Sequence, residues 1–175
     1  KEMIRHQIQA QAKTINARVV IDEDLLDEVT ALVEWPVALI GSFDERFLSV
    51  PKEALVSSMK KHQKCFYLED ENGSIKPNFI TVSNIQSVDP EVVINGNERV
   101  IRPRLADADF FFEQDKKVSL ASRTDKLKTV IFEQTLGTLF DKAQRVANLG
   151  SYIANAIGAD QVSVVRAAEI AKCDL

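Results

Sequence analysis

The stretch KCFYLEDENGSIKPNFITVSN, residues 64–84, decides the fold class. It contains two short segments rich in aromatic and β-branched residues, KCFYLED and NFITVSN, and this composition is typical of β-strands. The Asn72-Gly73 pair between them is typical of a tight turn, because glycine adopts positive φ angles at no steric cost. The sequence therefore predicts two antiparallel strands, near residues 64–69 and 78–84.

Further strands and several helices are expected upstream of this hairpin. VALIGSF (37–43) is a short apolar run, and RFLSV (46–50) follows the polar Asp44-Glu45 pair, so these two segments predict a second hairpin. Apolar residues at helical spacing, with a cap or a proline near the start of two of the segments, predict three helices: residues 2–17, residues 24–34 capped by Asp22, and a helix that begins at Pro51.

Downstream of Asp89-Pro90 the pattern is almost entirely helical. Pro103 lacks a backbone donor, so we expect it to kink or divide the first of these helices. Further helices are predicted from residues with helical periodicity, at 119–135, at 138–157 ending at Gly158, and from about Gln161. No strand is expected after residue 118. The predicted fold class is α+β, with a mixed α/β region at 1–118 and a helical region at 119–175.

Composition limits the possible functions. The chain has 175 residues and a net charge of -4, so nucleic-acid binding would require a local basic patch. Neither a signal-like start nor a long apolar run is present, which predicts a cytoplasmic protein without a membrane segment, and Cys65 and Cys173 are expected to be buried filler. Both ends lie within helical patterns that lack caps, which indicates a piece of a longer polypeptide.

The motifs of most enzymes are missing. The six glycines form no phosphate-binding loop, and the two histidines, His6 and His62, do not lie at metal-ligand spacing. Cys65 follows His62 by three residues, a spacing that would fit a catalytic pair but is better explained by a buried thiol next to a surface histidine. We therefore expect no catalytic residue, no metal and no cofactor in this chain.

Two basic clusters are candidate phosphate contacts. The first lies in GNERVIRPRLADADFFF (96–112) and consists of Arg99, Arg102 and Arg104. The second lies in SMKKHQK (58–64), at the end of a predicted helix, and consists of Lys60, Lys61 and Lys64. The lysines could also be solvated cations at a helix C-terminus.

The arginines could also belong to a buried helix with local ion pairs. Arg104 and Asp107, at i and i+3, are spaced to form one such pair. The three consecutive phenylalanines, 110–112, wrap most of a helix, which predicts burial between two layers.

Four longer stretches are distinctive: LVEWPVALIGSFDERFLSVPKEALVSSMKKHQKCF, PNFITVSNI, GNERVIRPRLADADFFFEQDKK and LGTLFDKAQRV. In this order they resemble the β-chain family of bacterial tetrameric glycyl-tRNA synthetase, and the resemblance extends over essentially the whole chain. It implies that residues 1–118 belong to a region similar to the B3/B4 module of phenylalanyl-tRNA synthetases. Residues 119–175 would then begin a helical domain similar to HD proteins. The absence of a His-Asp doublet fits such a scaffold without a metal.

The resemblance also implies a function. In that family a separate α-chain, which uses ATP and Mg²⁺, activates glycine, whereas the β-chain binds and positions glycine tRNA within an α2β2 heterotetramer. This chain is then expected to be a non-catalytic, tRNA-binding segment of an aminoacyl-tRNA ligase. Two alternatives stay open. The segment could be purely architectural, or its B3/B4-like pocket could retain an editing-type hydrolysis, although glycine has little need of a second sieve.

Overall fold

The computed structural model describes residues 1–175, and residues 1–112 form a first unit built on a four-stranded antiparallel sheet. The strand order is β1-β3-β4-β2, and the bounds are β1 Arg18–Val19, β2 Val37–Ser42, β3 Phe66–Glu69 and β4 Ile75–Ser83. β3 and β4 form the hairpin predicted from residues 64–84, and their turn contains Gly73 with a φ of +81°. β1 has no counterpart among the predicted strands, because two residues are too few to show a period.

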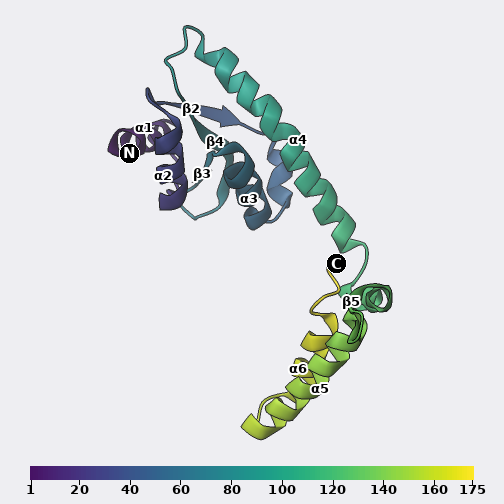
Figure 1. Cartoon of the computed structure of the whole chain (residues 1–175). Helices are drawn as coiled ribbons and strands as arrows, with labels where there is room; N and C mark the ends of the chain where they lie inside the picture. The colour runs from purple at the N-terminus through teal and green to yellow at the C-terminus, as the bar shows by residue number, and fades with distance from the viewer. The chain divides into compact units, whose positions relative to one another are not determined.

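Helices cover both faces of this sheet (Figure 1). α1 (Glu2–Thr14) and α2 (Glu23–Leu32) lie on one face, over a core that includes the buried Leu26 and Ile80. A second core, around Phe47 and Phe79, lies on the other face. It is enclosed by η1 (Glu45–Ser49), α3 (Lys52–Gln63) and α4 (Pro90–Lys116). Consecutive residues of β4 therefore serve opposite cores, as the alternation of side chains along a strand requires.

Residues 45–49 form the 3₁₀-helix η1, so the strand predicted at 46–50 is wrong. The Asp44 carboxylate accepts a hydrogen bond from the Arg46 N–H (3.0 Å) and caps η1. Phe47 and Val50 are both buried, and their separation of three residues matches one 3₁₀ turn. The apolar residues thus follow a period of three, which a five-residue segment cannot distinguish from alternation.

α4 is continuous from Pro90 to Lys116, so the expected division at Pro103 is wrong. Proline removes one hydrogen bond, the one that the carbonyl of Arg99 would accept. Pro103 and Arg99 are both exposed, so this carbonyl lies on the exposed side of the helix, where water can solvate it. The buried side of α4, with Ile101 and Leu105, keeps the helix packed on the second core.

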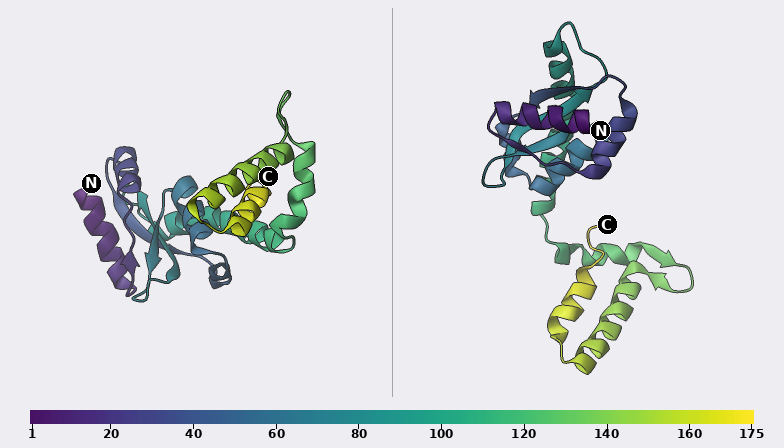
Figure 2. Two further views of the ribbon diagram at one scale, coloured as in Figure 1. Left: turned by 90° about the horizontal axis from the view of Figure 1, so that it is seen from below. Right: turned by 90° about the vertical axis from the view of Figure 1, so that its left-hand side faces the viewer.

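Residues 113–175 form a second unit, which is mostly helical. Its elements are η2 Leu120–Thr129, β5 Ile131–Glu133, β6 Gly137–Thr138, α5 Leu139–Ile157 and α6 Gln161–Ile170. α5 and α6 lie side by side (Figure 2). The α+β class and the helical character of this part are confirmed.

The continuous helix predicted at 119–135 is wrong, and so is the expectation of no strand after residue 118. η2 ends at Thr129, and β5 and β6 form a short hairpin. Its turn is closed by the Glu133 carboxylate, which accepts hydrogen bonds from the backbone of Thr135 and Leu136 (2.8 and 3.0 Å). Gly137 follows with a φ of +86°, which ends any helical path.

Several local signals are confirmed. Asp22 caps α2 through the Leu25 N–H (3.0 Å), Pro51 precedes α3, and Gly158 ends α5 with a φ of +71°. Cys65 and Cys173 are both buried. None of the helices has the length and apolar character needed to span a lipid bilayer.

Candidate nucleic-acid interface

The middle of α4 carries the first basic cluster on a helix that is fixed from its other side. Ile101 and Leu105 are almost completely buried in the second core. One turn earlier, the Glu98 carboxylate accepts hydrogen bonds from the backbone N–H and the hydroxyl of Ser42 in β2 (2.8 Å each). These contacts hold the arginine-bearing segment of α4 in a defined orientation.

Arg99, Arg102 and Arg104 are all exposed, and none of them forms an ion pair with a carboxylate of the chain. The pair that spacing allows between Arg104 and Asp107 is not formed, and Glu113 pairs with Lys116 instead (2.8 Å). The guanidinium groups of the three arginines are therefore available to a partner. A planar guanidinium can bind a phosphate through two hydrogen bonds.

The lysine cluster is placed differently. Lys60 forms an ion pair with Asp22, and Lys64 forms one with Glu28 (2.7 Å), so both tie the end of α3 to α2. The hydrogen bond between Lys60 and Asp22 raises the pKa of Lys60 and lowers the pKa of Asp22. Lys61 is exposed and forms no ion pair. Of the six basic candidates, two are thus committed to contacts within the chain.

The phenylalanines at the end of the basic stretch contradict the predicted burial. Phe112 packs against the second core, but Phe110 and Phe111 are 55% and 63% exposed. Their rings meet edge to face, with 5.5 Å between the centroids. The sequence did contain the signal for this arrangement. Apolar residues at Ile101, Leu105, Ala108 and Phe112 follow the helical period, and residues 110 and 111 fall outside that row.

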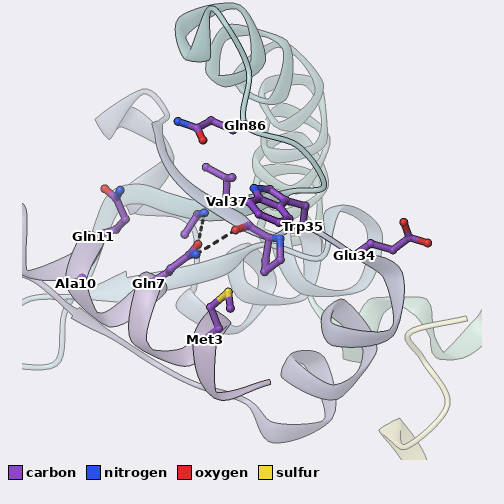
Figure 3. A pocket seen from close by; sticks show the side chains of 10 residues that line it. Met3, Gln7, Ala10, Gln11, Glu34, Trp35, Val37 and Gln86 are labelled. Atoms are coloured by element: carbon purple, nitrogen blue, oxygen red, sulfur yellow. Dashed lines mark hydrogen bonds between the residues drawn. The ribbon is translucent and has the colours of Figure 1, made fainter.

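A pocket of about 540 Å³ lies beside β2 in the first unit and was not anticipated from the sequence (Figure 3). Its ten lining residues come from α1, the segment before β2, β2 itself and Gln86. The Gln7 amide donates to the Pro36 carbonyl (3.0 Å) and accepts from the Ala38 N–H (2.9 Å). The Asn84 side chain accepts hydrogen bonds from the N–H groups of Glu34 and Trp35, which holds the Trp35 segment in place.

The chemistry of this pocket gives no support to editing-type hydrolysis. Glu34 is the only ionisable side chain among the lining residues, and no serine, threonine, cysteine or histidine accompanies it. A hydrolytic site needs a nucleophile or a bound water together with a base and a group that stabilises the oxyanion. The exposed Trp35 ring and the apolar walls favour binding of an uncharged group over catalysis.

Cys65 and His62 do not form a catalytic pair. The Cys65 thiol is buried and donates to the carbonyl of Gln63 (3.3 Å), whereas His62 is exposed on α3. Burial raises the pKa of Cys65 to about 12, so the reactive thiolate is not formed near neutral pH. No three histidine, cysteine or acidic side chains come together in a way that could hold a metal ion.

One buried carboxylate lies apart from both basic clusters. Glu69 in β3 accepts hydrogen bonds from Lys52 and Arg18, and only 4% of the residue is exposed. The hydrogen bond from Lys52 is the largest cause that lowers the pKa of Glu69; Arg18 adds to it, and burial opposes it. This cluster joins β1, β3 and α3, so its role is to hold the first unit together.

Comparison with known proteins gives a consistent result. The family described as "Glycyl-tRNA synthetase beta subunit" matches residues 1–175. The glycine–tRNA ligase beta subunit of Chromohalobacter salexigens is 62% identical over all 175 residues, and that of Pseudoalteromonas translucida is 57% identical. The corresponding subunit of Pseudomonas aeruginosa is 50% identical over the same length. The chain covers 25%, 25% and 26% of these three relatives, about a quarter of their length.

Proposed function

Because the chain belongs to the glycyl-tRNA synthetase beta-subunit family, we propose that it is the part of a glycine–tRNA ligase beta chain that helps to bind and position tRNA(Gly). One observation supports this role above the others. Arg99, Arg102 and Arg104 are exposed and unpaired on a helix whose other side is anchored in a core. Arginines that face solvent without a carboxylate are suited to phosphate contacts, which position a nucleic acid without reading its sequence.

The rest of the proposal concerns the assembled enzyme. We expect the beta chain to act with a separate alpha chain in an α2β2 heterotetramer in the cytoplasm. The alpha chain would use ATP and Mg²⁺ to activate glycine, and the present segment would contribute no catalytic group. The isolated chain should then show no glycine-dependent ATP–pyrophosphate exchange. ATP–pyrophosphate exchange above background without the alpha chain would contradict the assignment of glycine activation to that chain.

The RNA contact is tested by the salt dependence of binding. The Arg99→Ala, Arg102→Ala double variant is made in the full beta chain, and its affinity for tRNA(Gly) is measured over a range of salt concentrations. Each lost phosphate contact lowers the slope of log K against log salt by about 0.7 to 0.9, so the double variant should lose about 1.4 to 1.8. The matched control is the Arg99→Lys, Arg102→Lys variant, which keeps both charges and should keep most of the slope.

The alternative is that the segment is architectural and does not contact RNA. The ion pairs of Lys60 and Lys64 with α2 favour this interpretation for those two lysines. The double-alanine variant tests whether the arginines are structural too. If its salt slope is unchanged and circular dichroism shows a folded protein, the architectural interpretation holds for the arginines as well. The proposed tRNA contact at α4 would then be wrong.

A further inference from the structure

Phe110 and Phe111 are an unusual pair for the surface of a protein. Both rings are more than half exposed, they contact each other edge to face, and neither belongs to a hydrophobic core. Scattered single apolar residues on a surface need no explanation, but adjacent exposed aromatic rings form a patch that a ligand can cover. The neighbouring Phe112, which does pack on the core, keeps the helix in the orientation that turns these two rings outward.

Each ring lies on the same row of α4 as one of the free arginines, and the two rows are about 120° apart around the helix axis. Arg104 and Phe111 are seven residues apart, and Arg99 and Phe110 are eleven apart, which correspond to about two and three helical turns. At 1.5 Å per residue these pairs are separated along the helix axis by about 10 and 16 Å. Arg102 lies three residues after Arg99, about 60° from it around the helix axis and on the side away from Phe111. We call the exposed surface formed by these five residues, which spans more than half of the helix circumference, the α4 outer face.

Charge along α4 changes sign within this face. The arginines occupy residues 99–104, whereas Asp107, Asp109 and Glu113 surround the phenylalanines. A phosphate is therefore attracted to the first half and repelled from the second. A ligand that covers the whole face needs an anionic group at the arginines and a flat, uncharged group at the rings, and a nucleotide has both.

The exposed rings also determine which form of RNA fits. In a double helix the faces of the bases are stacked on one another and are not available to side chains. In unpaired segments the bases can be splayed out and stacked on aromatic rings. An apolar protein surface could cover the phenylalanines, but it would leave three arginines without a counter-ion.

We propose that the α4 outer face holds an unpaired segment of tRNA, with phosphates at the arginines and a base stacked on the Phe110–Phe111 pair. This inference rests on the proposed function and specifies the part of the RNA that is bound. The strand crosses α4 so that its phosphates stay at the basic half while a base reaches the rings. The stacked base is not read by hydrogen bonds, so any of the four bases can occupy the site.

The test compares three double variants in the full beta chain assembled with its alpha chain, with a tRNA(Gly) transcript as the probe. Phe110→Ala, Phe111→Ala should weaken binding roughly 5- to 150-fold, as expected for one lost base–aromatic stack. The salt slope should stay unchanged, because no phosphate contact is removed. Phe110→Tyr, Phe111→Tyr should bind as the native chain does, whereas Phe110→Leu, Phe111→Leu should bind like the alanine variant.

The outcomes separate this inference from the proposed function. A lower salt slope in the arginine variant together with native affinity in the alanine variant of the phenylalanines would keep the tRNA contact and overturn the stacking. Native affinity in the leucine variant would show that apolar packing suffices, and would also overturn it. A fully paired RNA duplex of matched length serves as the second probe, and its binding should not depend on the phenylalanines. Equal losses for duplex and tRNA, or a loss of alpha-chain association with unchanged tRNA affinity, would contradict the proposal.

Discussion

The two units of the chain differ in what they bury. The first unit encloses large side chains on both faces of its sheet, and Phe47, Phe66 and Phe79 have no exposed surface. In the second unit the buried residues are mostly small, with Ala143, Ala147 and Ala154 on one side of α5 and larger residues of that helix exposed. The first unit thus depends on packing between distant residues. The second depends more on close helix contact and on local hydrogen bonds.

Local hydrogen bonds are indeed prominent in the second unit. Thr138 and Asp141 form a capping box at the start of α5, with a bond of 3.2 Å from the Asp141 N–H to the Thr138 hydroxyl and one of 2.8 Å from the Thr138 N–H to the Asp141 carboxylate. Asp160 caps α6, and Ser119 caps η2. Such caps connect residues two or three positions apart, so they form without a large core.

The largest effect is expected from a cavity in the first unit. Phe79→Ala removes a fully buried ring from the second core and should lower the free energy of unfolding by about 3–5 kcal/mol. Urea unfolding followed by circular dichroism measures the change, and hydrogen exchange should place it in residues 1–112. The control is Phe111→Ala, an exposed ring, which should change the free energy by no more than about 0.5 kcal/mol. Similar losses of unfolding free energy in both variants would refute the assignment of Phe79 as buried and Phe111 as exposed.

Replacing one glycine by alanine in each unit compares how rigidly the two units are packed. Gly41 lies opposite Phe79 in the sheet, and a Cβ at Gly41 would be 2.3 Å from the Phe79 ring. Because that ring cannot move within a packed core, Gly41→Ala should cost about 1–3 kcal/mol. Gly150 lies in α5, where an added Cβ would be 2.8 Å from a methyl group of Val164. There the crowding is opposed by a gain in helix propensity of about 1 kcal/mol, so Gly150→Ala should be close to neutral.

A double variant checks the cause assigned to Gly41. If the alanine methyl collides with the ring, the Gly41→Ala, Phe79→Leu variant should be more stable than the sum of the two single changes implies. Additive losses in urea unfolding would show that the collision is not the reason. A strongly destabilised Gly150→Ala variant would show instead that the α5–α6 contact is as rigid as the sheet.

A smaller effect is expected at the capping box. Thr138→Ala removes the hydroxyl that accepts from the Asp141 N–H and should cost about 1 kcal/mol. Hydrogen exchange should show the loss as fraying of the first turn of α5. Thr129→Ala is the control within the same unit, because that hydroxyl donates only to the Lys126 carbonyl within η2 (2.8 Å). If the α5 amides are equally protected from hydrogen exchange in both variants, the local cap does not stabilise the second unit.

The last prediction concerns acid stability of the first unit. The pKa of Glu69 is lowered below its usual value of 4.5, so its carboxylate stabilises the fold above about pH 4.5. That contribution is lost as the pH falls through the lowered pKa. Glu69→Gln cannot titrate, so the stability difference between native chain and variant should shrink between pH 5 and pH 3. Urea midpoints over this range measure the difference, and a difference that stays constant from pH 5 to pH 3 would contradict the role assigned to Glu69.

Local signals in the sequence predicted most of the elements. The cap at Asp22, the proline before α3 and the glycine after α5 each act within one or two turns, so the residues alone were sufficient to place these helices. The hairpin of β3 and β4 was predictable for the same reason, because the Asn72-Gly73 turn is local. By contrast, η1 and the β5–β6 hairpin are short, and their patterns fit more than one period.

The candidate site was predicted less well, because it depends on which face each helix turns toward a partner. The sequence indicated two basic clusters but not that Asp22 and Glu28, more than thirty residues away, pair with the lysines. Tertiary contacts decide those pairings. The pocket next to Trp35 likewise exists only because α1 and β2 come together. The exposure of Phe111, by contrast, could have been predicted, because the helical row from Ile101 to Phe112 leaves residue 111 outside it; the composition of three adjacent aromatics favoured burial instead, and that prediction was wrong.

Gln7 has a consequence for the behaviour of the protein at high concentration. β2 is an edge strand, and such edges can pair with strands of other molecules and begin aggregation. The Gln7 amide binds the Pro36 carbonyl and the Ala38 N–H, and the Glu98 carboxylate binds the Ser42 N–H, so both ends of the edge are already hydrogen-bonded and a neighbour's strand could reach only its middle. A side chain from α1 thus supplies hydrogen bonds that a further strand would otherwise supply. Without that amide, the unpaired backbone groups would allow this edge to pair with other molecules at concentrations where the native chain stays dissolved.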